Sequence, residues 1–308
     1  MAIDPGSVTP VTVNHSSPRR KTKSAGAQLS KETEHMAMIR NDQAQSFLPE
    51  DFGQMLDLVV QAKSVAANAS TIFPTEKQKV GFPLWVADPA VGWYGELDEI
   101  TPADGDTDEV VVTPSKTAGL TLLSNELADD SDPAVADQIG AALGNQIAQA
   151  IDTAYFGNTT AKGPNGLLSL ASTAVDAGTA VANLDAFIEA RYAAEANGAK
   201  LSHWLVAPSI AEELSKLKTA SGSNQPLLQF VQDGITVAGL PVLTSTHVDA
   251  GTVAWGVDKT QQRYVLRKGT TVERFPSVTN DGLYVRAISR IGLGFLNPAG
   301  VVRVTLSA

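Results

Sequence analysis

The chain contains 308 residues, of which 43% are apolar and 18% charged, and its formal net charge at pH 7 is −10. This composition is typical of a folded globular protein, and the length predicts about two domains. The absence of cysteine excludes disulfide scaffolds, thiolate catalysis and cysteine-based zinc sites. The negative charge argues against a protein that coats nucleic acid with a basic surface.

The first fifty residues are rich in Pro, Ser, Thr and Gly and poor in large apolar side chains. Such a segment cannot bury enough apolar surface to offset its chain entropy, so the sequence predicts a flexible arm. It contains no signal-peptide core, and no apolar run in the chain is long enough to span a membrane. We therefore expect synthesis in a cytoplasm. The basic cluster of this arm is a candidate surface for a scaffold or for DNA, and it consists of Arg19, Arg20, Lys21 and Lys23.

From Pro49 to about Thr71 the apolar residues recur at helical spacing, which predicts a helix. The period then changes to two, in an outgoing stretch from "GFPLWVAD" to "GWYGELDEI" and a returning stretch, "EVVVTPSKTAGLTLLSNEL". This alternation predicts a long β-hairpin of about fifty residues. Between Val80 and Ser115 the hairpin contains no Lys or Arg.

The far end of this hairpin is strongly acidic, and "DEITPADGDTDE" (98–109) contains six carboxylates. Asp104, Asp106 and Asp108 match the first ligand positions of a calcium loop, but Glu109 and Ser115 stand where a Gly and a bidentate Glu are needed. A hairpin tip in water also lacks the walls that acid–base catalysis requires. We therefore expect a solvated tip that contacts another subunit. The candidate contact residues are Glu96, Asp98, Glu99, Asp104, Asp106, Asp108 and Glu109.

A long helix is predicted after the hairpin, with Ser131 or Asp132 as N-cap, Pro133 in the first turn and Gly157 at its end. A compact segment of alternating helices and strands follows, and the C-terminal third is rich in predicted strands. The apolar stripe predicted for the long helix consists of Ala136, Ile139, Leu143, Ile147, Ala150, Ile151 and Ala154.

No catalytic or cofactor-binding motif is present. The sequence lacks G-x-S-x-G, a Walker loop and H-E-x-x-H, and "GLGFLN" (292–297) lacks the third Gly of a dinucleotide loop. The four histidines are far apart and do not have the spacing of a metal-binding helix. We therefore expect a protein that is not an enzyme and binds no cofactor or metal. The histidines are His15, His35, His203 and His247.

The order of these parts resembles the major capsid protein of tailed bacteriophages with the Hong Kong 97-type fold, an α+β fold. The resemblance covers about residues 45–308, and it rests on the number and order of the similar segments. These segments are "VGWYGELDEI", "VVVTPSKTAGLTLLSNELADDSDPAV", "IAQAIDTAYFGN", "GPNGLLS", "HWLVAPSIAEELSKLK", "ITVAGLPVLTS" and "VRAISRIGLGFLNPAGVVRVTL".

The resemblance implies a division of the chain into the parts of that fold. These are an N-terminal arm (1–52), a helical segment (53–75), an extended loop (76–127), a peripheral domain with a spine helix (128–180), an axial domain (181–257) and returning strands of the peripheral domain (258–308). It also implies copies that form hexamers and pentamers of an icosahedral shell around double-stranded DNA, assembled in the bacterial cytoplasm. The implied partners are a scaffolding protein, a portal and a decoration protein.

Some members of this family join neighbouring subunits through an isopeptide bond between a Lys of the extended loop and an Asn of the peripheral domain. Residues 80–115 of the loop contain no Lys, and Asn297 has no evident partner. The sequence therefore predicts a shell held by non-covalent contacts. Two alternatives remain open from the sequence: a nanocompartment shell that resembles encapsulin, and a metal-dependent enzyme that uses the acidic stretch.

Overall fold

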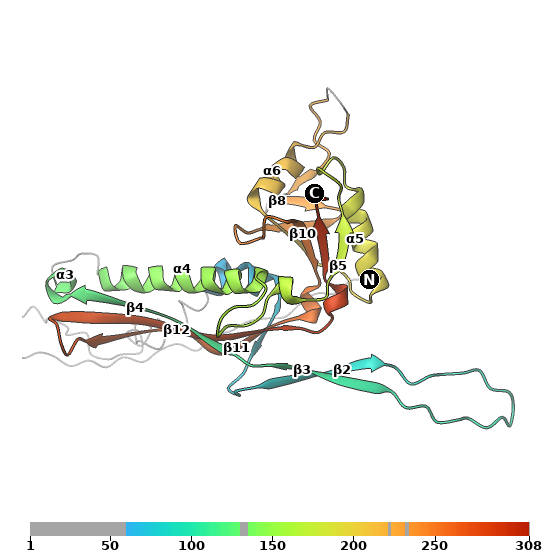
Figure 1. The fold of residues 1–308 in the computed structure, drawn as a ribbon, viewed down its shortest axis with the longest axis horizontal. Coiled ribbons are helices and arrows are strands. Elements are labelled where there is room, and N and C mark those ends of the chain that lie inside the picture. The colour runs from blue at the N-terminus through green and yellow to red at the C-terminus, as the bar shows by residue number, and fades with distance from the viewer. Residues whose placement is uncertain (1–59, 130–134, 221–222, 232–233, 308) are drawn as a thin grey trace, which may run out of the picture. The chain divides into compact units, whose positions relative to one another are not determined.

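The computed structural model describes residues 60–129, 135–220, 223–231 and 234–307. The chain divides into two units, Met1–Gln45 and Ser46–Ala308, and all described residues belong to the second. These residues form an α+β fold with a four-stranded sheet, a seven-stranded sheet and a two-stranded ribbon (Figure 1). The basic cluster of the arm and the predicted caps Ser131, Asp132 and Pro133 lie outside the described residues.

The described helices agree with most of the predicted ones. The helix expected up to Thr71 is interrupted at Ser64, because the Ser64 side chain caps a new short helix, and Thr71 already begins a strand. The helices are α2 (Val65–Ala69), α3 (Asn125–Asp129), α4 (Val135–Phe156), α5 (Asp185–Ala196) and α6 (Pro208–Lys216).

The four-stranded sheet packs one face against the long helix α4. Its order is β1 (Thr71–Pro74), β11 (Gln262–Pro276), β12 (Gly282–Phe295) and β4 (Ser115–Ser124). Ile147 and Ile151 of α4 share a buried core with Ala287 and Ile291 of β12. A side chain at Gly119 would meet Leu143 of α4 at 2.9 Å, so glycine lets β4 approach the helix closely.

The predicted stripe of α4 is only partly correct. Ile147, Ile151 and Ala154 are buried, whereas Ala150 is exposed. The last turn instead buries Tyr155 and Phe156, because this turn packs against both sheets. A stripe predicted for a single contact surface does not include these two residues. The side chain of Ala136 lies outside the described residues.

The seven-stranded sheet forms a second core with α5 and α6. Its order is β5 (Thr173–Asp176), β13 (Val302–Thr305), β10 (Thr252–Val257), β6 (His203–Val206), β9 (Leu240–Thr244), β8 (Gly234–Val237) and β7 (Gln229–Val231). Strand β6 is buried on both faces: Trp204 joins this second core, and Leu205 joins the core around α4. The two sheets are thus connected through a shared layer of apolar side chains.

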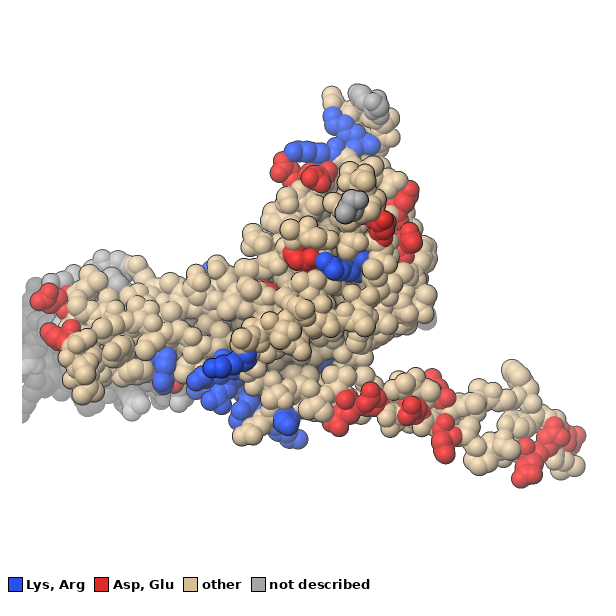
Figure 2. All heavy atoms as spheres, in the orientation of Figure 1, with Lys and Arg blue, Asp and Glu red and all other residues tan. Residues whose placement is uncertain are grey.

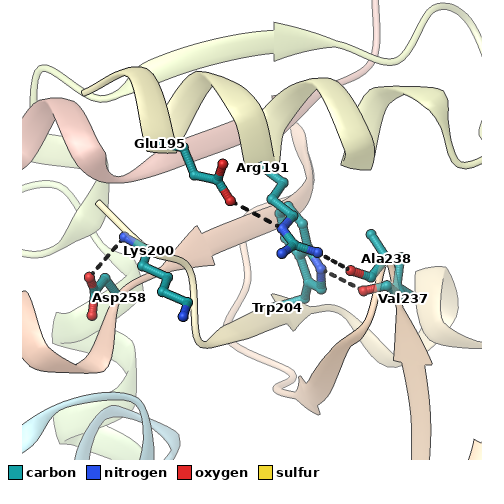
Figure 3. Close-up of polar contacts among 7 residues, drawn as sticks. All are labelled: Arg191, Glu195, Lys200, Trp204, Val237, Ala238 and Asp258. Atoms are coloured by element: carbon teal, nitrogen blue, oxygen red, sulfur yellow. Dashed lines mark hydrogen bonds and ion pairs between the residues drawn. The ribbon is translucent and has the colours of Figure 1, made fainter. Parts of the chain in front are cut away.

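Polar contacts fix α5 and the β8–β9 turn around Trp204 (Figure 3). The Trp204 indole donates to the carbonyl of Val237 at 3.0 Å, and Arg191 donates to the carbonyl of Ala238 at 3.1 Å. Ala238 has a positive φ of 49°, so its carbonyl is held in a tight turn before Gly239. Below this site, the backbone N–H of Lys200 donates to Asp258 at 3.1 Å.

The ribbon consists of β2 (Val80–Ala87) and β3 (Asp106–Val112), paired antiparallel with Val80 opposite Val112. The predicted hairpin is therefore shorter than expected, because the returning stretch after Val112 leaves it and becomes β4 of the four-stranded sheet. Strands β5 and β13, which we assigned to the peripheral domain, belong to the seven-stranded sheet. The predicted boundary at residue 180 thus lies after the first strand of the seven-stranded sheet. The boundary at 257 coincides with the change from β10 to β11, but β13 later returns to the seven-stranded sheet.

Candidate assembly surfaces

All seven predicted acidic contact residues of the ribbon are exposed. Asp106, Asp108 and Glu109 lie on β3, and the other four lie in the connection between the strands. Two carboxylates accept short local hydrogen bonds, Asp98 from the backbone N–H of Gly95 at 2.6 Å and Asp108 from that of Glu109 at 2.7 Å. Figure 2 shows acidic side chains along the whole ribbon. No group of three or more potential metal ligands occurs in the described part of the chain.

The same ribbon exposes large apolar side chains that the sequence analysis did not single out. Trp93 and Leu97 are fully exposed, and Trp85 is 69% exposed. The sequence contained one signal of this apolar surface, namely aromatic side chains between carboxylates. Tryptophan is uncommon in a loop that contacts only water. Several large apolar side chains exposed on one element indicate an interaction site. The exposed apolar residues of the ribbon are Trp85, Val86, Val91, Trp93, Tyr94, Leu97, Ile100 and Val111.

The base of the ribbon is fixed on the four-stranded sheet. Val80 and Val112 share a small buried cluster with Val265 of β11. A side chain at Gly292 or Gly294 of β12 would lie within 2.7 Å of Val112, so both glycines make room for this contact. The start of "GLGFLN", Gly292–Phe295, therefore belongs to a strand with a close backbone approach and not to a dinucleotide loop.

The cross-linking candidate Asn297 is engaged within its own subunit. Its Oδ1 atom accepts from the backbone N–H of Gly300 at 3.0 Å, and its Nδ2 atom donates to the carbonyl of Asn197 at 2.8 Å. These contacts join the end of β12 to the end of α5. Asn297 therefore has a structural role in connecting the end of β12 to the end of α5.

The two described histidines lie apart, on different elements. His203 contacts the Ser202 hydroxyl at 2.8 Å, and burial, together with the nearby charge of Lys259, lowers the pKa of His203. His247 contacts the Thr153 hydroxyl at 3.1 Å. Neither histidine belongs to a cluster of potential metal ligands within the described ranges.

The described residues form no cluster of metal ligands, whereas the ribbon exposes acidic and large apolar side chains. These features indicate a protein that acts through its surfaces, and the comparisons with known proteins agree. The model of the phage capsid family matches residues 45–306. The chain belongs to the phage capsid family. No curated protein matches the chain in sequence.

Solved structures show the fold of this capsid protein. The capsid of an empty GTA particle superposes with a TM-score of 0.69 at 18% identity, covering 80% of this chain and 90% of the other. A structure from Mycobacterium phage Bobi gives 0.65 at 17% identity, covering 80% and 91%. One from Microbacterium phage Oxtober96 gives 0.67 at 15% identity, covering 79% and 91%. The predicted Hong Kong 97-type fold is confirmed.

The family determines the role of the chain. It is a major capsid protein of the tailed-phage type, a structural component of the virion whose copies form an icosahedral shell. The match favours the capsid over the two alternatives that the sequence left open. No described helix is long and apolar enough to cross a membrane.

Proposed function

We propose that the β2–β3 ribbon of each capsid protein lies on a neighbouring copy and holds the pentamers and hexamers of the shell together by non-covalent contacts. The observation that carries this proposal is the exposure of Trp85, Trp93 and Leu97 on one ribbon. Burial of apolar surface stabilises by about 25 cal/mol per Å². A partner that covers these side chains gains free energy that the isolated subunit cannot.

Non-covalent assembly is supported by the lack of an amine on the ribbon. Residues 80–115 contain no Lys, and Asn297 is already hydrogen-bonded within its own subunit. An isopeptide bond between these two surfaces would therefore lack one reactant, and we propose no enzymatic or self-linking activity. Denaturing gels of mature shells should show a single monomer band. A ladder of covalent multimers would contradict this proposal.

We propose the domain division that the resemblance implies, except that β5 and β13 move from the peripheral to the axial domain. Residues 76–127 serve as the extended loop, residues 128–180 and 258–308 as the peripheral domain, and residues 181–257 as the axial domain. The pairing of β5 and β13 with the seven-stranded sheet supports placing these two strands in the axial domain.

The remaining partners are proposed from charge. The arm carries Arg19, Arg20, Lys21 and Lys23 without a neighbouring acid, which suits contact with a scaffolding protein or with packaged DNA. The net charge of −10 suits a shell that binds its genome weakly. Assembly in the host cytoplasm with a portal, and stabilisation by a decoration protein, complete the proposal. Native particles should contain double-stranded DNA, and an enzyme cargo in its place would contradict it.

The decisive experiment replaces the tip of the ribbon. In this variant, a short Asn-Gly turn replaces residues 88–105. The variant keeps the whole β2–β3 ladder, because the outermost pair of that ladder is Ala87 with Asp106. We expect the variant to fold, with the circular dichroism of the parent, and to form no closed shells in electron micrographs. Normal shells from this variant would refute the role of the ribbon.

A further inference from the structure

A row of positive charge crosses the four-stranded sheet on the face that points away from α4. Lys116 of β4 lies opposite Arg290 of β12, and Arg290 lies opposite Lys268 of β11. Residues that pair across neighbouring strands project from the same side of a sheet. Three cations from three adjacent strands therefore stand side by side, and Figure 2 shows basic side chains gathered in this part of the molecule.

The acid nearest to this row is already engaged. Glu273 lies opposite Arg286 and pairs with it, and its carboxylate is 3.9 Å from the Lys268 ammonium. The hydrogen bond from Arg286 holds the pKa of Glu273 below its usual value, so this carboxylate stays ionised. Among the described residues, Lys116 and Arg290 have no ion-pair partner. These two cations are therefore available to an anion from outside the subunit.

The turn between β1 and β2 extends the positive surface. Arg267 of β11 donates to the carbonyl of Glu76 in this turn over 3.4 Å, and Lys77 and Lys79 of the same turn are exposed. Three cations and one acid thus adjoin the row. Neighbouring strands are about 4.8 Å apart, so the whole strip is far wider than one small anion. Its charges suit a polyanion with regularly spaced phosphates.

Aromatic side chains lie further along the same face. Tyr284, Arg286 and Arg290 alternate with buried residues of β12, so all three project from this side. Phe275 of β11 lies opposite Tyr284 with the ring centroids 6.2 Å apart, and the Arg286 guanidinium is 4.9 Å from the Phe275 ring. Tyr284 precedes Arg290 by six residues, so about 20 Å separate the aromatic pair from the row of cations. A strip of this length accommodates a few nucleotides.

We propose that this face binds single-stranded RNA in the unassembled subunit, with phosphates on Lys116, Arg290 and Lys268 and a base stacked on Tyr284. An open sheet face with cations and aromatic rings provides charge for the backbone and a flat surface for unpaired bases. A duplex hides the flat faces of its bases and would use the cations alone. RNA is the single strand that a subunit made in a cytoplasm meets. The inference goes beyond the role of the ribbon and does not depend on it.

Binding to a labelled oligouridylate of about twelve nucleotides tests the proposal. Fluorescence anisotropy is measured at several salt concentrations, with the full-length protein below the concentration at which shells form. The cation variant carries Lys116→Gln and Arg290→Gln, and the aromatic variant carries Tyr284→Leu. The control, Lys200→Gln with Lys218→Gln, replaces two exposed lysines outside the four-stranded sheet. A fourth variant replaces the basic cluster of the arm by glutamine, and circular dichroism establishes that each protein is folded.

The cation variant is expected to bind RNA about tenfold more weakly, and the slope of log K against log salt should fall by about 1.4, because each phosphate contact contributes about 0.7. Tyr284→Leu is expected to weaken binding by about fivefold and to keep the slope, because stacking releases no counterions. The control should match the parent in both values.

Three results would overturn the proposal. Equal affinity of the parent and the cation variant would show that the row does not hold phosphates. Loss of binding in the arm variant alone would assign the RNA to the arm. A duplex of the same length that binds as tightly as the single strand would show that unpaired bases are not recognised, and Tyr284→Leu should then have no effect.

Discussion

The hydroxyl of Ser64 donates a hydrogen bond to the carboxylate of Asp152 over 2.7 Å, although 88 positions separate the two residues. The same carboxylate accepts from the backbone N–H groups of Val65 at 3.1 Å and Ala66 at 3.0 Å. These N–H groups open α2 and have no partner inside the helix. Asp152, which is buried on α4, therefore caps α2 from a distant element and fixes the path of the chain into β1.

Replacement of this carboxylate is expected to destabilise the subunit. Asp152→Ala leaves three buried or half-buried donors without an acceptor and should lower the free energy of unfolding by about 2–4 kcal/mol. Asp152→Asn keeps one acceptor and should lose less. Urea unfolding of unassembled protein, followed by circular dichroism, measures both. Exposed Glu189→Ala serves as the control, and an Asp152→Ala loss no larger than that of the control would contradict the capping role.

A methyl group at Gly292 is expected to loosen the foot of the ribbon. Its Cβ would lie 2.7 Å from a Val112 methyl group, so Gly292→Ala must displace β3 at a cost of about 1–3 kcal/mol. Limited proteolysis should then cleave the ribbon faster. At Gly251 the added Cβ would meet its nearest atom at an ordinary 3.5 Å, which makes Gly251→Ala the matched control. Equal cleavage rates for the two variants would show that the contact does not hold the ribbon.

Tryptophan fluorescence should report the docking of the ribbon. Trp204 and Trp255 are fully buried in the subunit, whereas Trp85 and Trp93 are exposed. Assembly is expected to shift the emission to the blue and to reduce quenching by iodide, because only the two ribbon tryptophans change environment. Trp85→Phe with Trp93→Phe should abolish the shift. An unchanged spectrum on assembly of the parent protein would mean that the ribbon stays in solvent.

Alkaline pH should destabilise the subunit through Tyr155. Burial raises the pKa of the Tyr155 phenol far above its ordinary value of 10.0, while the unfolded chain ionises near that ordinary value. The folded state therefore retains the proton that the unfolded state loses, and stability falls as the pH rises above 10. Tyr155→Phe removes this dependence and also the hydrogen bond to Gln262, at about 1 kcal/mol near neutral pH. Unfolding curves at pH 8 and pH 10.5 test the sign. A slope that Tyr155→Phe leaves unchanged would assign the effect to other groups.

The sequence predicted the order of elements because local periodicity determines it. Helix α4 follows from a single long apolar stripe, and the alternation before Ala87 and after Asp106 predicts a ribbon. The pairing of strands that are far apart in the sequence has no such local pattern. The alternation of β4 indicates a strand but not its partner, so β4 was assigned to the hairpin, whereas it pairs with β12.

The acidic side chains of the ribbon were visible in the sequence, and a row of cations across the four-stranded sheet was not. Six carboxylates within twelve consecutive residues are easily recognised in the sequence. Lys116, Lys268 and Arg290 are far apart along the chain, and only the register of three strands brings them together. The burial of Tyr155 in place of Ala150 has the same origin, since both depend on contacts with sheets that local spacing does not specify.

The positions of β12 and β13 have a consequence for synthesis. Strand β12 lies between β11 and β4, and β13 lies between β5 and β10. Each sheet therefore lacks an inner strand until late in synthesis, because β12 and β13 are made after every helix from α2 to α6. Chains arrested before Val302 are expected to be digested by protease as readily as unfolded protein. Because the four-stranded sheet and the foot of the ribbon are complete only once β12 has emerged, nascent chains on one messenger should be unable to associate before that point.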